Sequence, residues 1–244
     1  MKHIPLQTGP FKKWPFFEPD EIEKMAVADL KQTGLLPQEP RAIDVDALAR
    51  KLFSFDLTYA ETGDGILGYI SFGPRGPEKI TINSDLADLT TGLTTEHRRK
   101  STATHEVGHG RLHAGPFIEL ALAREHGIFG EFVRNASLQP LRACRSQDIR
   151  DGELAKVPRL QGWEAMAEWQ ANRYMAAALA PARLLQRAVT GLRHGAGVHS
   201  GLDAEEREDL VPAVSEIFNI SKKLARNRMA ELFPPAGAQR EMFA

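Results

Sequence analysis

Cysteine is almost absent from this 244-residue chain, which contains only Cys144. A single cysteine excludes an intramolecular disulfide, and with it the small disulfide-stabilised secreted scaffolds. An excess of charge of one sign is also missing, because 31 lysines and arginines stand against 32 aspartates and glutamates and the formal net charge is -1. This balance gives no overall electrostatic basis for binding nucleic acid or an acidic membrane surface.

Long apolar runs are missing as well. No stretch approaches the roughly 18 consecutive apolar residues that a membrane-spanning helix needs. The N-terminal residues 1–7 lack the apolar run of a secretory signal. We therefore expect a cytoplasmic protein that has no membrane span. The hydrophobic content of 42% and the charged content of 26% are those of an ordinary globular protein.

Hydrophobic periodicity predicts an α+β protein that is mainly helical. Residues 1–18, rich in proline and aromatics, are expected to form an irregular arm packed on the body. Three strands joined by tight turns predict a small, mostly antiparallel sheet. The other predicted elements are helices, since their apolar residues recur at three- and four-residue spacing. The predicted strands cover 53–59, 66–72 and 79–83, and the predicted helices cover 19–33, 45–52, 96–113, 117–126, 162–179, 183–192 and 203–233.

The chain is predicted to comprise one main domain and a short C-terminal unit. Residues 1–192 would form the main domain, with a long excursion over 127–162 that shows no clear period. Residues 203–233 predict two helices that break at Asn219, with Ser221 capping the second, and these helices would pack on the first domain. This is the outline of a helix-turn-helix. Its second helix is basic, but the neutral charge of the chain favours a packing helix with a solvated face over one that reads DNA.

The most informative motif is His105-Glu106-Val107-Gly108-His109, within a predicted helix. Residues four apart on a helix differ by about 40° in azimuth and about 6 Å in rise, so the two histidines share a face. Both imidazoles can present a nitrogen to one zinc ion at about 2.0–2.1 Å. Glu106, one step round the helix, can reach a water on that metal but is not expected to be a ligand itself.

A catalytic zinc site needs a third protein ligand and an open position for water. Glu168, on the predicted helix 162–179, is the candidate, and Glu164 is its rival one turn earlier on nearly the same face. A carboxylate from a helix packed across the first one would complete the site. Asn172, four residues after Glu168, would share its face and could hydrogen-bond a ligand histidine.

With these two motifs the chain resembles the ImmA/IrrE family of zinc-dependent peptidases. The resemblance rests on Thr102 to His109 with His113 after it, and on Glu168-Trp169-Gln170-Ala171-Asn172 continuing to Pro181. It implies that His105, His109 and Glu168 are zinc ligands and that Glu106 is the general base. The span between His109 and Glu168 is longer than the family pattern.

The resemblance further implies a regulatory endopeptidase that cleaves a protein substrate, such as a helix-turn-helix repressor. The alternative is a non-catalytic regulator or antitoxin-like protein that contains zinc and binds a partner. A third possibility, DNA binding through 203–233, has little support from the charge, so nucleic acid is not expected as a direct ligand.

Five further residues are candidates for a role at the site, and a structural role is favoured for four of them. His113 and Tyr174 are candidates for stabilising an oxyanion, although His113 is favoured as a helix-end residue that bonds a carbonyl. Cys144 could be a thiolate ligand that masks zinc, but a buried free cysteine is favoured. His194 and His199 are favoured as loop residues rather than ligands, because no regular spacing fixes them relative to a metal.

Overall fold

The computed structural model describes residues 1–88, 92–145, 162–193 and 202–234. Across these residues the protein is α+β, with eight α-helices and two small sheets, and this agrees with the predicted class. The strands are β1 (Lys2–Pro5), β2 (Lys13–Phe16), β3 (Thr58–Ala60), β4 (Ile66–Gly73), β5 (Gly76–Asn83) and β6 (Leu141–Arg145). The helices are α1 (Pro19–Gln32), α2 (Val45–Phe53), α3 (Leu93–Leu112), α4 (Ala114–His126), α5 (Trp163–Leu179), α6 (Ala182–Leu192), α7 (Ala204–Phe218) and α8 (Lys222–Leu232).

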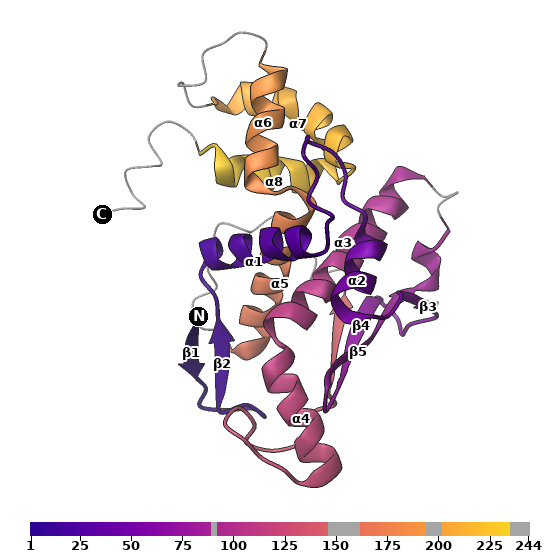
Figure 1. Cartoon of the computed structure of the whole chain (residues 1–244), viewed down its shortest axis with the longest axis vertical. Helices are drawn as coiled ribbons and strands as arrows, with labels where there is room; N and C mark the ends of the chain where they lie inside the picture. The colour runs from indigo at the N-terminus through magenta and orange to yellow at the C-terminus, as the bar shows by residue number, and fades with distance from the viewer. Residues whose placement is uncertain (89–91, 146–161, 194–201, 235–244) are drawn as a thin grey trace.

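The elements form an elongated body with α3 at its centre (Figure 1). The strands β4 and β5 pack on one side of α3, and α5 packs on the other. The helices α6, α7 and α8 lie at one end of the body, and α4 lies at the other. No helix within the described ranges has the length and apolar character that crossing a membrane requires.

The larger sheet has four strands in the order β3-β5-β4-β6, not the three that the sequence predicts. The additional strand, β6, comes from the excursion that shows no period, and it pairs antiparallel with β4. The first predicted strand is shorter than expected, because α2 continues to Phe53 and Ser54 ends it with a left-handed φ of 64°. The remaining β3 runs parallel to β5, so the sheet is mixed.

The N-terminal arm is regular, which corrects the expectation of an irregular segment. Strands β1 and β2 pair antiparallel, with Ile4 opposite Trp14. The aromatics of the arm enter the core as predicted, and both Phe11 and Trp14 have no exposed surface. Phe11 lies with its ring centre 5.0 Å from that of Trp163 at the start of α5. The arm therefore covers the helix pair that carries the two motifs.

Two predicted helix caps are confirmed. The Asp44 carboxylate accepts the Ala47 N–H at 2.9 Å at the start of α2, and the Ser221 hydroxyl accepts the Leu224 N–H at 3.0 Å at the start of α8. Asn219, with a left-handed φ of 48°, separates α7 from α8 as predicted. These side-chain acceptors satisfy backbone donors that have no partner inside a helix.

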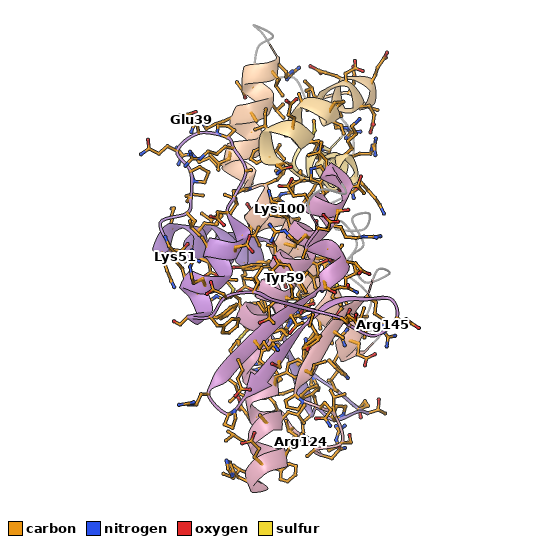
Figure 2. All side chains as sticks on the ribbon, turned by 90° about the vertical axis from the view of Figure 1, so that its right-hand side faces the viewer. Glu39, Lys51, Tyr59, Lys100, Arg124 and Arg145 are labelled. Atoms are coloured by element: carbon orange, nitrogen blue, oxygen red, sulfur yellow. The ribbon has the colours of Figure 1, made fainter. Side chains whose placement is uncertain are left out.

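The C-terminal helices are bonded to the main body through charged side chains. Arg228 of α8 is 2% exposed and donates to the Ala180 carbonyl at 3.0 Å. Lys100 of α3, labelled in Figure 2 above the sheet, donates to the Asn219 carbonyl at 3.1 Å. The division into a domain of residues 1–192 and a helix-turn-helix-like unit of residues 203–233 stays a prediction.

Candidate metal centre

Helix α3 places the two motif histidines on one buried face. Neither His105 nor His109 has exposed surface. Their Nε2 atoms lie 3.0 Å apart, as the four-residue spacing predicts for neighbours one turn apart. Both rings therefore present the nitrogen that is far from the backbone to the same point.

Glu168 of α5 reaches this point from across the helix pair. Its Oε2 lies 3.1 Å from His105 Nε2, and its Oε1 lies 3.3 Å from His109 Nε2. His105, His109 and Glu168, called the metal group below, could together hold a metal ion. The rival Glu164 is exposed and is not part of the metal group.

The dimensions of the metal group fit a tetrahedral metal. Ligand atoms at about 2.0–2.1 Å from a tetrahedral zinc lie about 3.3 Å from one another. The three contacts within the metal group measure 3.0, 3.1 and 3.3 Å. Two imidazoles and one carboxylate are also ligands that zinc accepts. Three protein ligands leave one tetrahedral position for a further group.

A glycine inside the motif lets the two helices approach closely enough to form the metal group. A Cβ on Gly108 would lie 3.1 Å from the Ala171 carbonyl oxygen and 3.2 Å from the Tyr174 Cβ. Real Cβ atoms rarely make such short contacts, so a larger residue at this position requires the backbone at Ala171 and Tyr174 to give by a few tenths of an ångström. The separation of the two helices determines how far Glu168 lies from the histidines.

Asn172 orients the ring of His105, as the sequence predicts. Its Oδ1 lies 3.1 Å from His105 Nδ1. An amide oxygen only accepts hydrogen bonds, so Nδ1 of His105 carries the proton. The Nε2 lone pair of a neutral His105 is then directed at the metal group, which is the tautomer that binds a metal.

His113 performs the corresponding role for His109, and this corrects the favoured prediction that it bonds a carbonyl. Its Nδ1 lies 2.9 Å from His109 Nδ1, and its Nε2 lies 3.4 Å from the Gln170 amide nitrogen. Gln170 is fixed in turn by the N–H of Phe17 and the carbonyl of Pro15. His113 is outside the metal group, in agreement with the expectation that it does not share the metal.

At neutral pH two members of the metal group, His109 and Glu168, have the protonation that metal binding requires. Burial lowers the pKa of His109 to about 4, so its ring is neutral. Burial raises the pKa of Glu168, but the adjacent His109 and His105 outweigh that effect and hold this pKa well below 4.5. A neutral imidazole and an ionised carboxylate both have lone pairs available for a metal.

Arg142 of β6 contacts the metal group, and the sequence analysis did not identify it. Its Nε donates to Glu168 Oε1 at 2.7 Å. Its guanidinium carbon also lies 5.4 Å from the ring centre of Trp163. The available signal was the alternation in 141–145, which places Arg142 and Cys144 on one face of a strand. That signal is weak because the strand is short and its partner β4 is distant in sequence.

The other residues that the sequence singled out for the site lie in different parts of the structure. Glu106 is fully buried and lies, with Cys144, close to His105. Tyr174 is fully buried and donates to Asp29 Oδ2 at 2.7 Å, so its hydroxyl is bonded to a carboxylate of α1. Burial raises the pKa of Tyr174 well above 10, which keeps that hydroxyl protonated. His194 and His199 lie outside the described residues.

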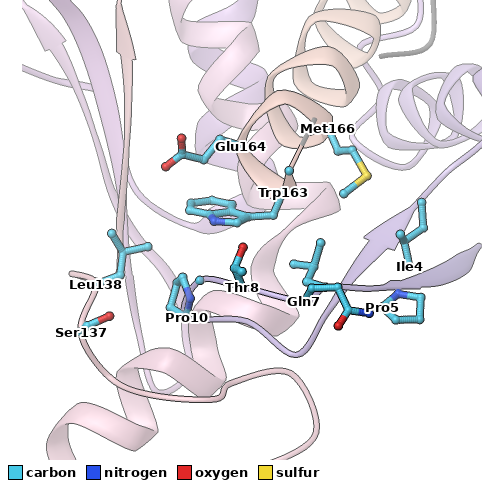
Figure 3. A pocket seen from close by; sticks show the side chains of 13 residues that line it. Ile4, Pro5, Gln7, Thr8, Pro10, Ser137, Leu138, Trp163, Glu164 and Met166 are labelled. Atoms are coloured by element: carbon cyan, nitrogen blue, oxygen red, sulfur yellow. The ribbon is translucent and has the colours of Figure 1, made fainter. Parts of the chain in front are cut away.

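A cavity of about 680 Å³ lies at the N-terminal end of α5 (Figure 3). The indole of Trp163 lies over the loop that carries Thr8 and Pro10, and Glu164 points toward Leu138. Most of the lining is apolar, and Glu164 is its one carboxylate. Trp163 connects the cavity to the metal group, because the same indole contacts Arg142.

Neither a model of a known protein family nor a curated protein matches this chain. A function can therefore be assigned only from the metal group and the side chains around it.

Proposed function

We propose that this chain is a zinc-dependent endopeptidase of the regulatory type, similar to the ImmA/IrrE family. The metal group of His105, His109 and Glu168 carries this proposal, because its contacts of 3.0–3.3 Å match the spacing of ligands on one tetrahedral zinc. The glutamate of the motif, Glu106, is buried, and one of its carboxylate oxygens lies within 4.8 Å of a ring nitrogen of His105, which supports the proposed role of general base.

Zinc held by the metal group would supply Lewis-acid polarisation of a peptide carbonyl and a bound water of pKa near about 7. Glu106 accepts the proton of the attacking water and returns it to the departing amine. Asn172 and His113 hold the two imidazoles by their Nδ1 atoms. Arg142 fixes one oxygen of Glu168, so that the carboxylate keeps its orientation.

We propose a protein substrate, and the family resemblance suggests a helix-turn-helix repressor. The apolar cavity beside Trp163 begins one helical turn before Glu168 and offers space for an apolar side chain. Nucleic acid is not proposed as a ligand. Arg226 donates to Glu208 at 2.7 Å and Arg228 is buried against Glu23, so these basic residues of α8 are engaged within the protein. We interpret the helix-turn-helix-like pair α7 and α8 as a packing element.

One observation favours the alternative of a non-catalytic zinc-containing regulator. The thiol of Cys144 lies close to His105 and Glu106, where it could complete a four-ligand set. Structural zinc sites have four protein ligands, whereas catalytic sites keep one position open. In this alternative Glu106 has no chemical role, and the chain acts by binding a partner.

The experiment that separates these functions compares three glutamate variants of the full chain. Zinc content is measured by mass spectrometry, and cleavage is measured on a peptide mixture derived from a proteome. We expect Glu106→Gln to retain one zinc and to lose cleavage by about 100-fold or more. Glu168→Gln should lose the zinc, and its matched control Glu164→Gln, which lines the proposed substrate cavity, should keep the zinc.

Two results would overturn the endopeptidase. A wild-type chain that binds no stoichiometric zinc removes the metal site altogether. A wild-type chain that binds zinc but cleaves no peptide leaves the non-catalytic alternative.

A further inference from the structure

Strand β6 presents two functional side chains on one face. Residues two apart in a strand point to the same side, so Arg142 and Cys144 share a face. Arg142 binds Glu168, which shows that this face is directed at the metal group. Cys144 has no exposed surface, although β6 is the last described strand of its sheet.

The thiol of Cys144 belongs to a second group of metal-binding side chains. Its sulfur and the ligand atoms of His105 and Glu106 all lie within 4.8 Å of one another. His105 is also a member of the metal group, so the sulfur lies beside that group on the side of Glu106. This is the side on which the attacking water must lie if Glu106 is to accept its proton.

Binding requires the sulfur to move toward the metal group. A thiolate sulfur at about 2.3 Å and an imidazole nitrogen at about 2.0–2.1 Å from one tetrahedral zinc lie about 3.6 Å apart. The sulfur now lies within 4.8 Å of a ring nitrogen of His105, but it is not grouped with His109 or Glu168. A change of side-chain rotamer together with a shift of β6 would bring it to the fourth position.

A buried hydroxyl next to this position supplies an independent observation. The Oγ1 of Thr102 is buried and has no hydrogen-bond partner among the described residues. Thr102 lies against Gly68, where an added Cβ would be 2.9 Å from its Cγ2. Gly68 is the residue of β4 that pairs with Cys144. A hydroxyl donor without a partner is therefore present near the β4–β6 pair, and hydrogen bonds from such a donor to a charged acceptor are stronger than those to a neutral one.

We propose that Cys144 is a fourth metal ligand, through which β6 closes the position of the attacking water and keeps the peptidase latent. This inference rests on the metal site of the proposed function. When the thiol binds, it gives its proton to solvent, and its sulfur takes the place of the metal-bound water. The reverse exchange, in which Cys144 withdraws and water enters, opens the site.

The single cysteine makes a direct test possible. The metal-free full chain is loaded with one equivalent of cobalt(II), and its near-ultraviolet spectrum is recorded. A thiolate-to-cobalt charge-transfer band is expected in the wild type, and only Cys144 can produce it. The band should disappear in Cys144→Ser while one cobalt remains bound. Arg145→Ala is the matched control, because Arg145 is exposed on the opposite face of β6 and should keep the band.

Zinc affinity provides a second measurement that does not depend on activity. Loss of an outer hydrogen-bond partner of a ligand weakens metal binding by about 10–100-fold, so loss of Cys144 itself should weaken it by at least about tenfold. Competition with a chelating dye measures this change in Cys144→Ser and Cys144→Ala. Thermal unfolding of the metal-free variants shows whether the fold has been kept.

The outcomes distinguish this inference from the function on which it rests. A wild type that binds one cobalt without a thiolate band overturns the role of Cys144 and leaves the metal site standing. A wild type that binds no cobalt overturns both. A latent peptidase should become faster in Cys144→Ala, and the added cleavage should vanish when Glu106→Gln is combined with it. A Cys144→Ala variant that cleaves no faster than the wild type overturns the latency.

Discussion

The Nδ1 atoms of His109 and His113 lie 2.9 Å apart, so one of them donates a hydrogen bond to the other. For His109 to bind a metal through Nε2, its own Nδ1 must carry the proton and His113 Nδ1 must accept it. The proton of a neutral His113 then lies on Nε2, which faces the Gln170 amide nitrogen at 3.4 Å, so metal binding requires a rearrangement of this contact. His113 therefore acts on the metal through His109.

We predict that His113→Ala weakens zinc binding by about 10–100-fold, because His109 loses the acceptor that orients its ring. His113→Gln, which retains an acceptor oxygen, should recover part of the affinity. Chelator competition measures the affinity, and thermal unfolding of the metal-free protein separates this effect from loss of packing against Trp14. Unchanged affinity in His113→Ala would contradict the role.

A second prediction concerns Arg142, which fixes Glu168 Oε1. Arg142→Ala should weaken zinc binding by about 10–100-fold, because the carboxylate loses the partner that holds it in place. The zinc affinity of Arg142→Lys should lie between those of the wild type and Arg142→Ala, since an ammonium lacks the planar fork of a guanidinium. The measurement is again zinc affinity. Equal losses in Arg142→Ala and in the exposed control Arg145→Ala would show a nonspecific charge effect.

A third prediction concerns the approach of α3 to α5 at Gly108. Gly108→Ala should destabilise the protein by about 1–3 kcal/mol, because the new methyl group overlaps the Ala171 carbonyl. It should also weaken zinc binding by moving Glu168 away from the histidines. Gly115→Ala is the matched control in a helix, since its Cβ meets nothing closer than 3.8 Å. Denaturant unfolding should show that the control is neutral or slightly stabilising.

A fourth prediction concerns pH. Burial lowers the pKa of His109 from 6.5 to about 4. Between pH 6.5 and about pH 4, His109 is therefore protonated in the unfolded chain but not in the folded chain. The stability of the metal-free protein should therefore fall as the pH is lowered through this window, by up to about 3 kcal/mol. The pKa of His113 is lowered in the same direction and adds to the loss. The low pKa of Glu168 acts only below 4.5.

Denaturant unfolding of the metal-free protein across this pH range checks the fourth prediction. His109→Gln should show a shallower dependence, because it removes one of the titrating groups. A wild type whose stability is flat over the window, or a variant with an undiminished slope, would contradict the assignment.

Local signals were sufficient to predict the helices and most of the metal group. Asp44 and Ser221 cap their helices through hydrogen bonds three residues along the chain, and such contacts are visible in sequence. His105 and His109 face one point because the helical repeat places them there. The same repeat applies to His109 and His113, so the contact between those rings was also predictable.

Pairing between distant segments could not be predicted in the same way. Strand β6 pairs with β4, and only this register brings Arg142 and Cys144 close to the metal group. Its five residues include two arginines, so the alternation along them is too short and too weak to mark a strand. The parallel pairing of β3 with β5 and the hairpin of β1 with β2 depend on contacts of the same distant kind.

Asp29 of α1 binds Arg111 of α3 through two contacts of 2.8 Å and accepts the Tyr174 hydroxyl of α5. This carboxylate joins the two helices of the metal group without help from any metal. The empty protein should therefore remain folded, unlike small zinc domains that collapse when they are stripped. If the metal group binds zinc as proposed, the loaded fraction should follow the free zinc concentration of the surroundings, so that zinc supply sets the amount of competent protein without new synthesis.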